Sequence, residues 1–146
     1  MTNDVDETVR GWIGTPFQHR ACLKGVGADC LGLLRGVWRE CHGDEPLDIP
    51  YYSQDWAEIG EGEPLLDAAR LIMPETNLLN ASTGDVLIFR IRRSARAKHI
   101  GFLSRSTAKD TTFIHSYARF GVVETSLSRP WRSRIAGVFK LTGRSM

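Results

Sequence analysis

Residues 29–43 read DCLGLLRGVWRECHG, and this stretch decides the fold class. Apolar side chains follow Cys30 at the spacing of one helical face: Leu33, Leu34, Val37 and Trp38. Asp29 precedes the run as a helix cap, and Gly43 follows it as a stop signal. We therefore predict a central buried helix that carries Cys30 in its first turn.

Helical and strand patterns occupy different parts of the chain. Residues 4–13 and 61–73 have the apolar spacing of two further helices, whereas residues 16–30 have no period and are expected to form an irregular loop. Five β-type runs follow, separated by polar or glycine-containing turns: 85–91, 99–104, 111–117, 121–126 and 135–141. This order predicts an α+β fold in which N-terminal helices pack on an antiparallel sheet.

Length and composition fit one globular domain, residues 1–146. Hydrophobic residues make up 42% of the chain and charged residues 25%, which excludes the disordered and fibrous classes. A formal net charge of +2 is too small to indicate a nucleic-acid partner. One local basic cluster is expected to be a solvated strand connection: Arg90, Arg92, Arg93, Arg96 and Lys98.

The N-terminal residues, MTNDVDETVRGW, lack the basic start and apolar stretch of a signal peptide. No apolar run approaches the roughly 18 residues of a membrane-spanning helix. We therefore expect synthesis in the cytoplasm without a signal peptide, and no membrane insertion.

Three cysteines, Cys22, Cys30 and Cys41, are an odd number without the paired spacing of a zinc ribbon. We expect at least one free thiol and no structural metal. Cys30 lies at a predicted helix start, where unpaired backbone amides and the helix dipole favour the thiolate. Cys30 is thus the candidate nucleophile; the alternative is a small, inert residue of a core helix.

A nucleophilic thiol needs a base and usually a group that orients the base. His99 opens one predicted strand and His115 lies within the next, so two adjacent antiparallel strands could bring both imidazoles together. The alternative is a pair of strand histidines that face water. His19 and His42 are expected at the surface.

Five ordered stretches resemble the NlpC-type papain-like peptidases of bacterial cell walls: GTPF from Gly14, DCLGLL from Asp29, TGDVLIF from Thr83, KHIGFL from Lys98 and FIHSY from Phe113. The resemblance implies a papain-like cysteine peptidase fold. It also implies Cys30 as the nucleophile, His99 as the base and His115 as the polar group that orients the base. Such chemistry needs neither a metal nor an organic cofactor.

The family usually has a tyrosine after the proline, assigned to the oxyanion site, where this chain has Phe17. Gln18, His19 or backbone amides are the candidates to supply the oxyanion donor instead. The implied substrate is a peptidoglycan stem peptide, an acidic ligand that a basic rim could steer: Arg90, Arg92, Arg93 and Arg119 are candidates. Trp56 and Trp131 are candidates for the cleft wall.

The sequence around Cys30, together with IPYYSQDW at residues 49–56, most resembles the phage-like branch associated with tail or gene-transfer particles. That branch implies tail hub or baseplate proteins as partners, and action on the wall of a target cell during DNA delivery. Two alternatives stay open. The chain could be a non-catalytic tail-tip or hub module with the same fold, or an amidase or acyltransferase of small amides and lipids.

Overall fold

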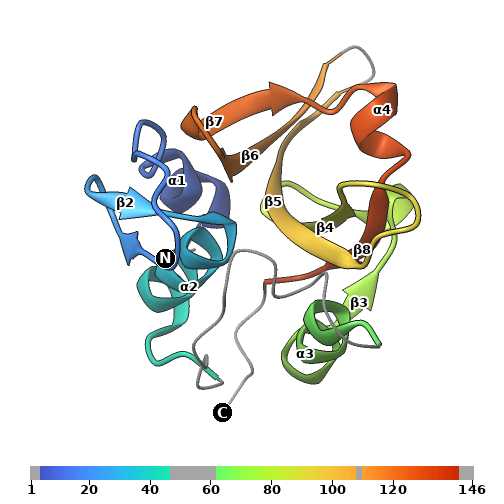
Figure 1. The fold of residues 1–146 in the computed structure, drawn as a ribbon, viewed down its shortest axis with the longest axis horizontal. Helices are drawn as coiled ribbons and strands as arrows, with labels where there is room; N and C mark the ends of the chain where they lie inside the picture. Colours follow the sequence, from blue (N-terminus) through green and yellow to red (C-terminus); the bar gives the residue numbers. More distant parts are fainter. Residues whose placement is uncertain (1–3, 47–61, 108–109, 142–146) are drawn as a thin grey trace.

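The computed structural model describes residues 4–46, 62–107 and 110–141. Helices α1 (Val5–Arg10) and α2 (Cys30–His42) form one layer together with the hairpin of β1 (Cys22–Leu23) and β2 (Gly27–Ala28). A curved sheet forms the other layer, with α3 (Pro64–Ile72) beside its outer strands (Figure 1). The predicted α+β fold with N-terminal helices packed on a sheet is confirmed.

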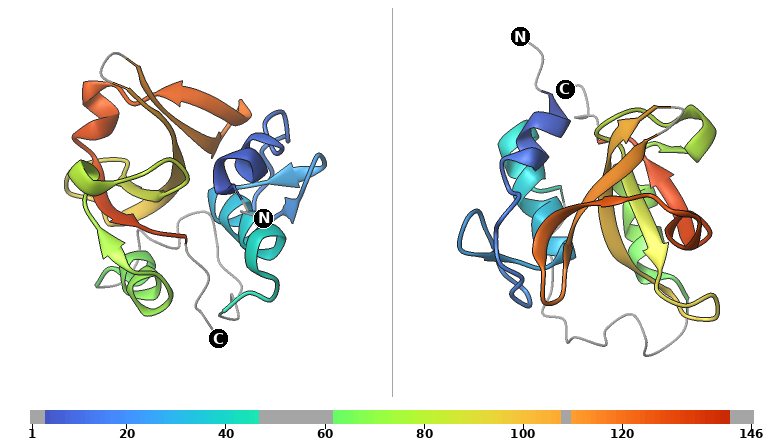
Figure 2. Two further views of the ribbon diagram at one scale, coloured as in Figure 1. Left: turned by 180° about the vertical axis from the view of Figure 1, so that it is seen from behind. Right: turned by 90° about the horizontal axis from the view of Figure 1, so that it is seen from above.

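The sheet has six strands in the order β3-β8-β4-β5-β6-β7, and all neighbours are antiparallel, as predicted. Its strands are β3 (Glu75–Thr76), β4 (Val86–Arg90), β5 (Ala97–Ser106), β6 (Thr111–Tyr117), β7 (Gly121–Ser126) and β8 (Ile135–Phe139). Figure 2 shows that β5, β6 and β7 are strongly curved. The start of β5 lies close to the helical layer, where the carbonyl of Lys98 is 3.5 Å from the sulfur of Cys30.

Helix α2 begins where the sequence predicts. The Asp29 side chain accepts a hydrogen bond from the backbone N–H of Gly32 at 2.7 Å, and Gly43 at the other end has a positive φ of 85°. Its apolar face is buried, and Gly32 and Gly36 allow the backbone of Ala21 and the ring of Trp12 to approach closely. Helix α2 is thus fixed tightly against the segment before it.

Each face of the sheet has its own apolar core. Residues that face the helices include Ile88, Ile100 and Ile114, which pack with Leu33 and Val37 of α2. The opposite face carries a second cluster: Leu87, Phe89, Leu103, Phe113, Leu127 and Val138, with Trp131 of α4 (Arg129–Arg132) packed against it. Because side chains alternate along a strand, successive residues within β5, and likewise within β6, pack into different cores.

Several short elements were absent from the sequence interpretation. The stretch expected to be an irregular loop, residues 16–30, contains the β1–β2 hairpin, whose two-residue strands are too short to show alternation. Strand β3, the 3-10 helix Leu78–Asn80 and α4 have only two, three and four residues. Among the described residues, no helix has the length and apolar character needed to cross a bilayer.

Several polar contacts join the layers. The hydroxyl of Ser116 on β6 donates to the backbone carbonyl of Ala28 at 2.6 Å, two residues before the start of α2. The guanidinium of Arg10 on α1 donates to both carboxylate oxygens of Glu124 on β7 and to the hydroxyl of Ser104. A bidentate pair of this kind fixes orientation as well as distance.

Candidate active site

Cys30 is the first residue of α2 and lies against the start of β5. Its sulfur is 3.5 Å from the backbone carbonyl of Lys98, the residue before His99. The helix start therefore meets the sheet at the strand that carries the predicted base.

Asp29 holds this helix start in place. One carboxylate oxygen accepts from the N–H of Gly32 at 2.7 Å, and the other accepts from the N–H of Arg20 at 2.7 Å. The Nδ1 atom of His19 lies 3.8 Å from the second oxygen. Asp29 thus ties the loop before α2 to the first turn of the helix.

The predicted histidine pair meets across strands β5 and β6. The register places Gly101 opposite His115, and Nε2 of His99 lies 2.7 Å from Nδ1 of His115. The Nε2 atom of His115 lies 2.8 Å from the hydroxyl oxygen of Thr125 on β7. Three adjacent strands therefore carry a continuous chain of polar groups.

Aromatic rings surround both imidazoles. Trp131 lies 5.7 Å from the His99 ring centroid and 5.3 Å from that of His115, and Tyr117 stacks on His115 at 5.3 Å. Burial in these surroundings lowers the pKa of His99 to about 3, with help from His115 and Lys98. Burial also lowers the pKa of His115 to about 4. Both rings are neutral at physiological pH.

The thiol of Cys30 is also neutral at rest. Burial of the sulfur, assisted by the Asp29 carboxylate, raises the pKa of Cys30 to about 12, although backbone amides of Ile100, Leu31 and Cys30 act in the opposite direction. The sequence argument for a stabilised thiolate was therefore wrong, because burial outweighs the helix terminus. A neutral thiol must lose its proton to a base during attack.

A cleft of about 320 Å³ opens at this point, and both Cys30 and His99 line it. Phe17 and His19 line the same cleft, whereas Gln18 does not and instead packs its side chain over Gly27. Of the three oxyanion candidates, His19 thus combines a place in the cleft with a polar hydrogen.

Two residues of this region were missed in the sequence. Tyr117 lines the cleft and also borders two further hollows. Thr125 is the hydroxyl partner of His115. Once β7 is known to pair with β6, Thr125 is the diagonal neighbour of His115, so strand pairing is the signal that could have found it.

None of the four arginines predicted for a basic rim lines the cleft itself. Arg90 is paired with Glu63 at 2.6 Å and donates to the Ala95 carbonyl, and neither Arg92, Arg93 nor Arg119 lines the cleft. The cation that does line it is Lys98. Trp131 lines the hollows next to the cleft, not the cleft of Cys30, and Trp56 lies outside the described residues.

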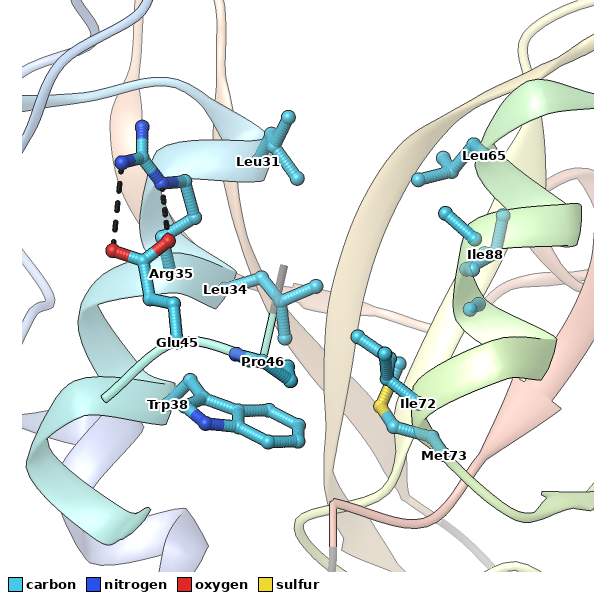
Figure 3. Close-up of a pocket in the computed structure, with 12 residues that line it drawn as sticks. Leu31, Leu34, Arg35, Trp38, Glu45, Pro46, Leu65, Ile72, Met73 and Ile88 are labelled. Atoms are coloured by element: carbon cyan, nitrogen blue, oxygen red, sulfur yellow. Dashed lines mark hydrogen bonds and ion pairs between the residues drawn. The ribbon is translucent and has the colours of Figure 1, made fainter. Parts of the chain in front are cut away.

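A second pocket lies between α2 and α3 and is almost wholly apolar. Figure 3 shows side chains of the α2 side facing those of the α3 side: Leu31, Leu34 and Trp38 opposite Leu65, Ile72 and Met73. Its charged lining residues, Arg35 and Glu45, are paired with each other at 2.7 Å. The described residues that line this pocket include no thiol, imidazole or hydroxyl group.

All three cysteines are free thiols, as the odd number suggested, and within residues 4–46, 62–107 and 110–141 no group of side chains is arranged to hold a metal ion. The site thus offers a thiol, two imidazoles in contact with each other and a cleft. These parts are suited to acyl transfer through a thioester.

The chain is 25% identical over 133 residues to a Haemophilus influenzae protein named "Probable endopeptidase", a match that covers 89% of this chain and 68% of the relative. A solved Staphylococcus aureus structure, described as similar to lipoprotein, NLP/P60 family, matches with a TM-score of 0.61 at 17% identity. That match covers 97% of this chain but only 41% of the other, so this chain spans less than half of its length. No family model matches the chain. The structural likeness establishes the papain-like fold.

Proposed function

We propose that this chain is a cysteine peptidase of the NlpC/P60 kind that hydrolyses an amide bond in peptidoglycan stem peptides. The observation that carries the proposal is the shared cleft of Cys30 and His99, with His99 held by His115 at 2.7 Å. The similarities to a probable endopeptidase and to an NLP/P60 structure support the same class.

In the first half of the reaction, the Cys30 sulfur attacks the amide carbonyl and forms the C–S bond. Since Nε2 of His99 is engaged with His115, Nδ1 takes the thiol proton. The carbonyl electrons move to oxygen, where the N–H of Cys30 at the helix start and the imidazole of His19 stabilise the charge. Collapse breaks the C–N bond, and the proton on His99 leaves with the amine.

In the second half, water attacks the thioester carbonyl while Nδ1 of His99 accepts a proton from it. Collapse of this intermediate breaks the C–S bond, and the proton returns from His99 to the sulfur. The carboxylic acid product leaves, and the neutral pair is restored. The low polarity around both rings keeps the imidazole uncharged between turnovers.

The choice of peptidoglycan rests on the resemblance to cell-wall peptidases together with the two comparisons. The stem peptide carries carboxylates, and Lys98 is the cation in the cleft wall that faces such a ligand. We further propose, from the phage-like resemblance, that the chain is carried in a phage-like tail and acts on the wall of a target cell. Co-purification with tail hub or baseplate proteins tests that role, and a chain found only free in the cytoplasm would argue against it.

The decisive experiment measures new amino groups released from purified peptidoglycan, with mass spectrometry of the fragments. Wild-type protein should release stem-peptide fragments, whereas Cys30→Ala and His99→Ala should be silent. Cys22→Ala removes a thiol of strand β1 outside the cleft and should retain full activity.

Two other outcomes would reject the proposal. Silence of the folded wild-type protein on every wall type tested would favour the non-catalytic tail module. Hydrolysis of small amides or acyl esters with no release from peptidoglycan would favour the amidase or acyltransferase.

A further inference from the structure

A hollow of about 250 Å³ meets the candidate active-site cleft at two shared side chains, Ile91 and Tyr117. Its other lining residues are Pro130, Trp131 and Arg134. The guanidinium and the indole can only donate hydrogen bonds, the phenol hydroxyl can donate or accept, and no carboxylate is among the described lining residues. The side chains of this hollow therefore suit a ligand that accepts hydrogen bonds.

The polar groups of the hollow are also unused within the fold. The indole N–H groups of Trp12 and Trp38 donate to the Glu40 carboxylate and the Asp44 carbonyl at 2.6 and 3.0 Å. Among the described residues, the indole N–H of Trp131 has no such acceptor, and the hydroxyl of Tyr117 has no hydrogen-bond partner either. Both groups thus stay available to a molecule that enters the hollow.

Arg134 is half-buried, and within the part of the chain that the structure describes its guanidinium has no hydrogen bond or ion pair. Three other half-buried arginines each pair with a glutamate: Arg10 with Glu124, Arg35 with Glu45, and Arg90 with Glu63. A guanidinium that is partly withdrawn from water is stabilised by an anion. Arg134 therefore presents a positive charge whose counterion the described side chains do not supply.

Backbone hydrogen bonds fix the position of Arg134 directly before β8. Its N–H donates to the carbonyl of Trp131 at 3.0 Å, and its carbonyl accepts from the N–H of Arg90 at 2.8 Å. The α-carbon is thus held between α4 and the end of β4. A side chain that starts from a rigid element can be placed more precisely than one on a free loop.

The hollow lies on the side of the proposed base. The rings of Tyr117 and Trp131 have their centroids 5.9 and 5.7 Å from that of His99. In the proposed reaction His99 gives its proton to the leaving amine, so the amine half of the substrate occupies this side. A guanidinium binds a carboxylate through two parallel hydrogen bonds, which favours an amine half that carries a carboxylate.

We propose that Arg134 is a specificity-determining residue that binds a carboxylate on the residue supplying the leaving amine, with the indole N–H of Trp131 and the hydroxyl of Tyr117 as further donors. The inference rests on the proposed peptidase function and names the half of the substrate that the site selects. A carboxamide in the same place has no charge and turns an N–H₂ group towards the donors, so it is rejected.

A nested set of synthetic stem peptides tests the inference at every amide bond of the stem. Each peptide is one residue longer than the one before and is made in two forms, with the carboxylates of its last residue either free or converted to carboxamides. At one length, the last residue directly follows the amide bond that lies at Cys30. The two forms of that length should differ in affinity.

Binding is measured by calorimetry in a Cys30→Ala background, which prevents turnover. At one length, the free-carboxylate form should bind roughly 10-fold or more tightly than the carboxamide. Arg134→Gln should abolish this difference, and Arg134→Lys should keep only part of it, since an ammonium lacks the planar fork. Arg132→Gln removes an exposed arginine of α4 that does not line the hollow, and it should keep the full difference.

Equal affinity of the two forms at every length would overturn the inference, as would a difference that survives Arg134→Gln. If Arg134→Gln does not fold, Arg134→Met, which keeps much of the apolar part of the side chain, takes its place. Binding needs no turnover. Selection through Arg134 in a protein whose wild type cleaves nothing would overturn the peptidase function and leave the carboxylate site intact, whereas cleavage without selection would do the reverse.

Discussion

Nε2 of His99 and Nδ1 of His115 lie 2.7 Å apart between two strands, in surroundings that keep both rings uncharged. A hydrogen bond between two neutral imidazoles fixes ring orientation without placing a charge on the partner of the proposed base. The site differs in this respect from a triad in which a carboxylate orients the histidine. A protonated ring here would be buried beside a second imidazole and Lys98.

As the pH is lowered, the free energy of unfolding should begin to fall at a higher pH than titration of the carboxylates alone would cause. The pKa of His99 falls from 6.5 to about 3 on folding, and that of His115 to about 4, so between these values the unfolded chain binds more protons. Stability is then present above pH 6.5 and is lost as pH falls towards the folded values, by up to ~1.4 kcal/mol per pH unit for each ring.

Urea unfolding between pH 3 and pH 7 measures this loss. Glu45, Glu63 and Glu124 also have lowered pKa values, but their contribution is lost only below their ordinary pKa of 4.5. A His99→Gln variant should have a flatter profile between pH 6.5 and 4.5. Parallel profiles for wild type and variant would contradict the prediction.

Asp29→Asn should lower the stability of the fold and raise the reactivity of the Cys30 thiol. The amide retains an acceptor for Gly32 but presents a donor to the N–H of Arg20, at a cost of about 1–3 kcal/mol. Loss of the carboxylate charge should lower the pKa of Cys30, because that charge helps to raise it. Alkylation of Cys30 by iodoacetamide, followed by peptide mass spectrometry, should therefore be faster at pH 8. Equal acceleration at Cys41 would show that local unfolding is the cause.

Two glycines of α2 should differ in their tolerance of a methyl group. A Cβ at Gly32 would meet the backbone carbonyl of Ala21, whereas a Cβ at Gly36 would meet the indole of Trp12. A side chain can move more readily than backbone, so Gly36→Ala should cost ~1–3 kcal/mol and Gly32→Ala more. Urea unfolding measures both, and the reverse ranking would show that the loop at Ala21 yields more easily than Trp12.

The oxyanion donor can be tested by removal and replacement. His19→Ala should lower kcat roughly 10²-fold, the usual effect of losing one donor. Phe17 lines the same cleft, so Phe17→Tyr in the His19→Ala background should restore part of the loss. Gln18→Ala is the control, since that side chain packs over Gly27. Full activity of His19→Ala would contradict this prediction and would indicate that backbone amides alone donate hydrogen bonds to the oxyanion.

Local patterns in the sequence were sufficient for the main elements. The cap at Asp29 and the apolar spacing after it predict α2, which begins at Cys30 as expected. Alternation and turn residues predict the five long strands, and their order predicts that His99 and His115 lie on neighbouring strands. Each of these inferences needs information from only a few successive residues.

The rest depends on tertiary structure. Thr125 becomes a partner of His115 only through the register of β6 and β7, and Gln18 is turned away by its packing on Gly27. The prediction of a stabilised thiolate at Cys30 was wrong because it, too, depends on tertiary structure. Helix position suggests an acidic thiol at Cys30, but the final pKa is set by burial between layers, which one segment alone does not reveal.

The hydrogen bond from Ser116 to the carbonyl of Ala28 crosses between the helical layer and the sheet, beside the start of α2. The proposed nucleophile, Cys30, belongs to the first layer, and the proposed base, His99, belongs to the second. On these proposed roles, a folding intermediate with only native helices or only a native sheet lacks half of the catalytic pair. Catalytic competence would then arise when the layers dock and would be lost when they part.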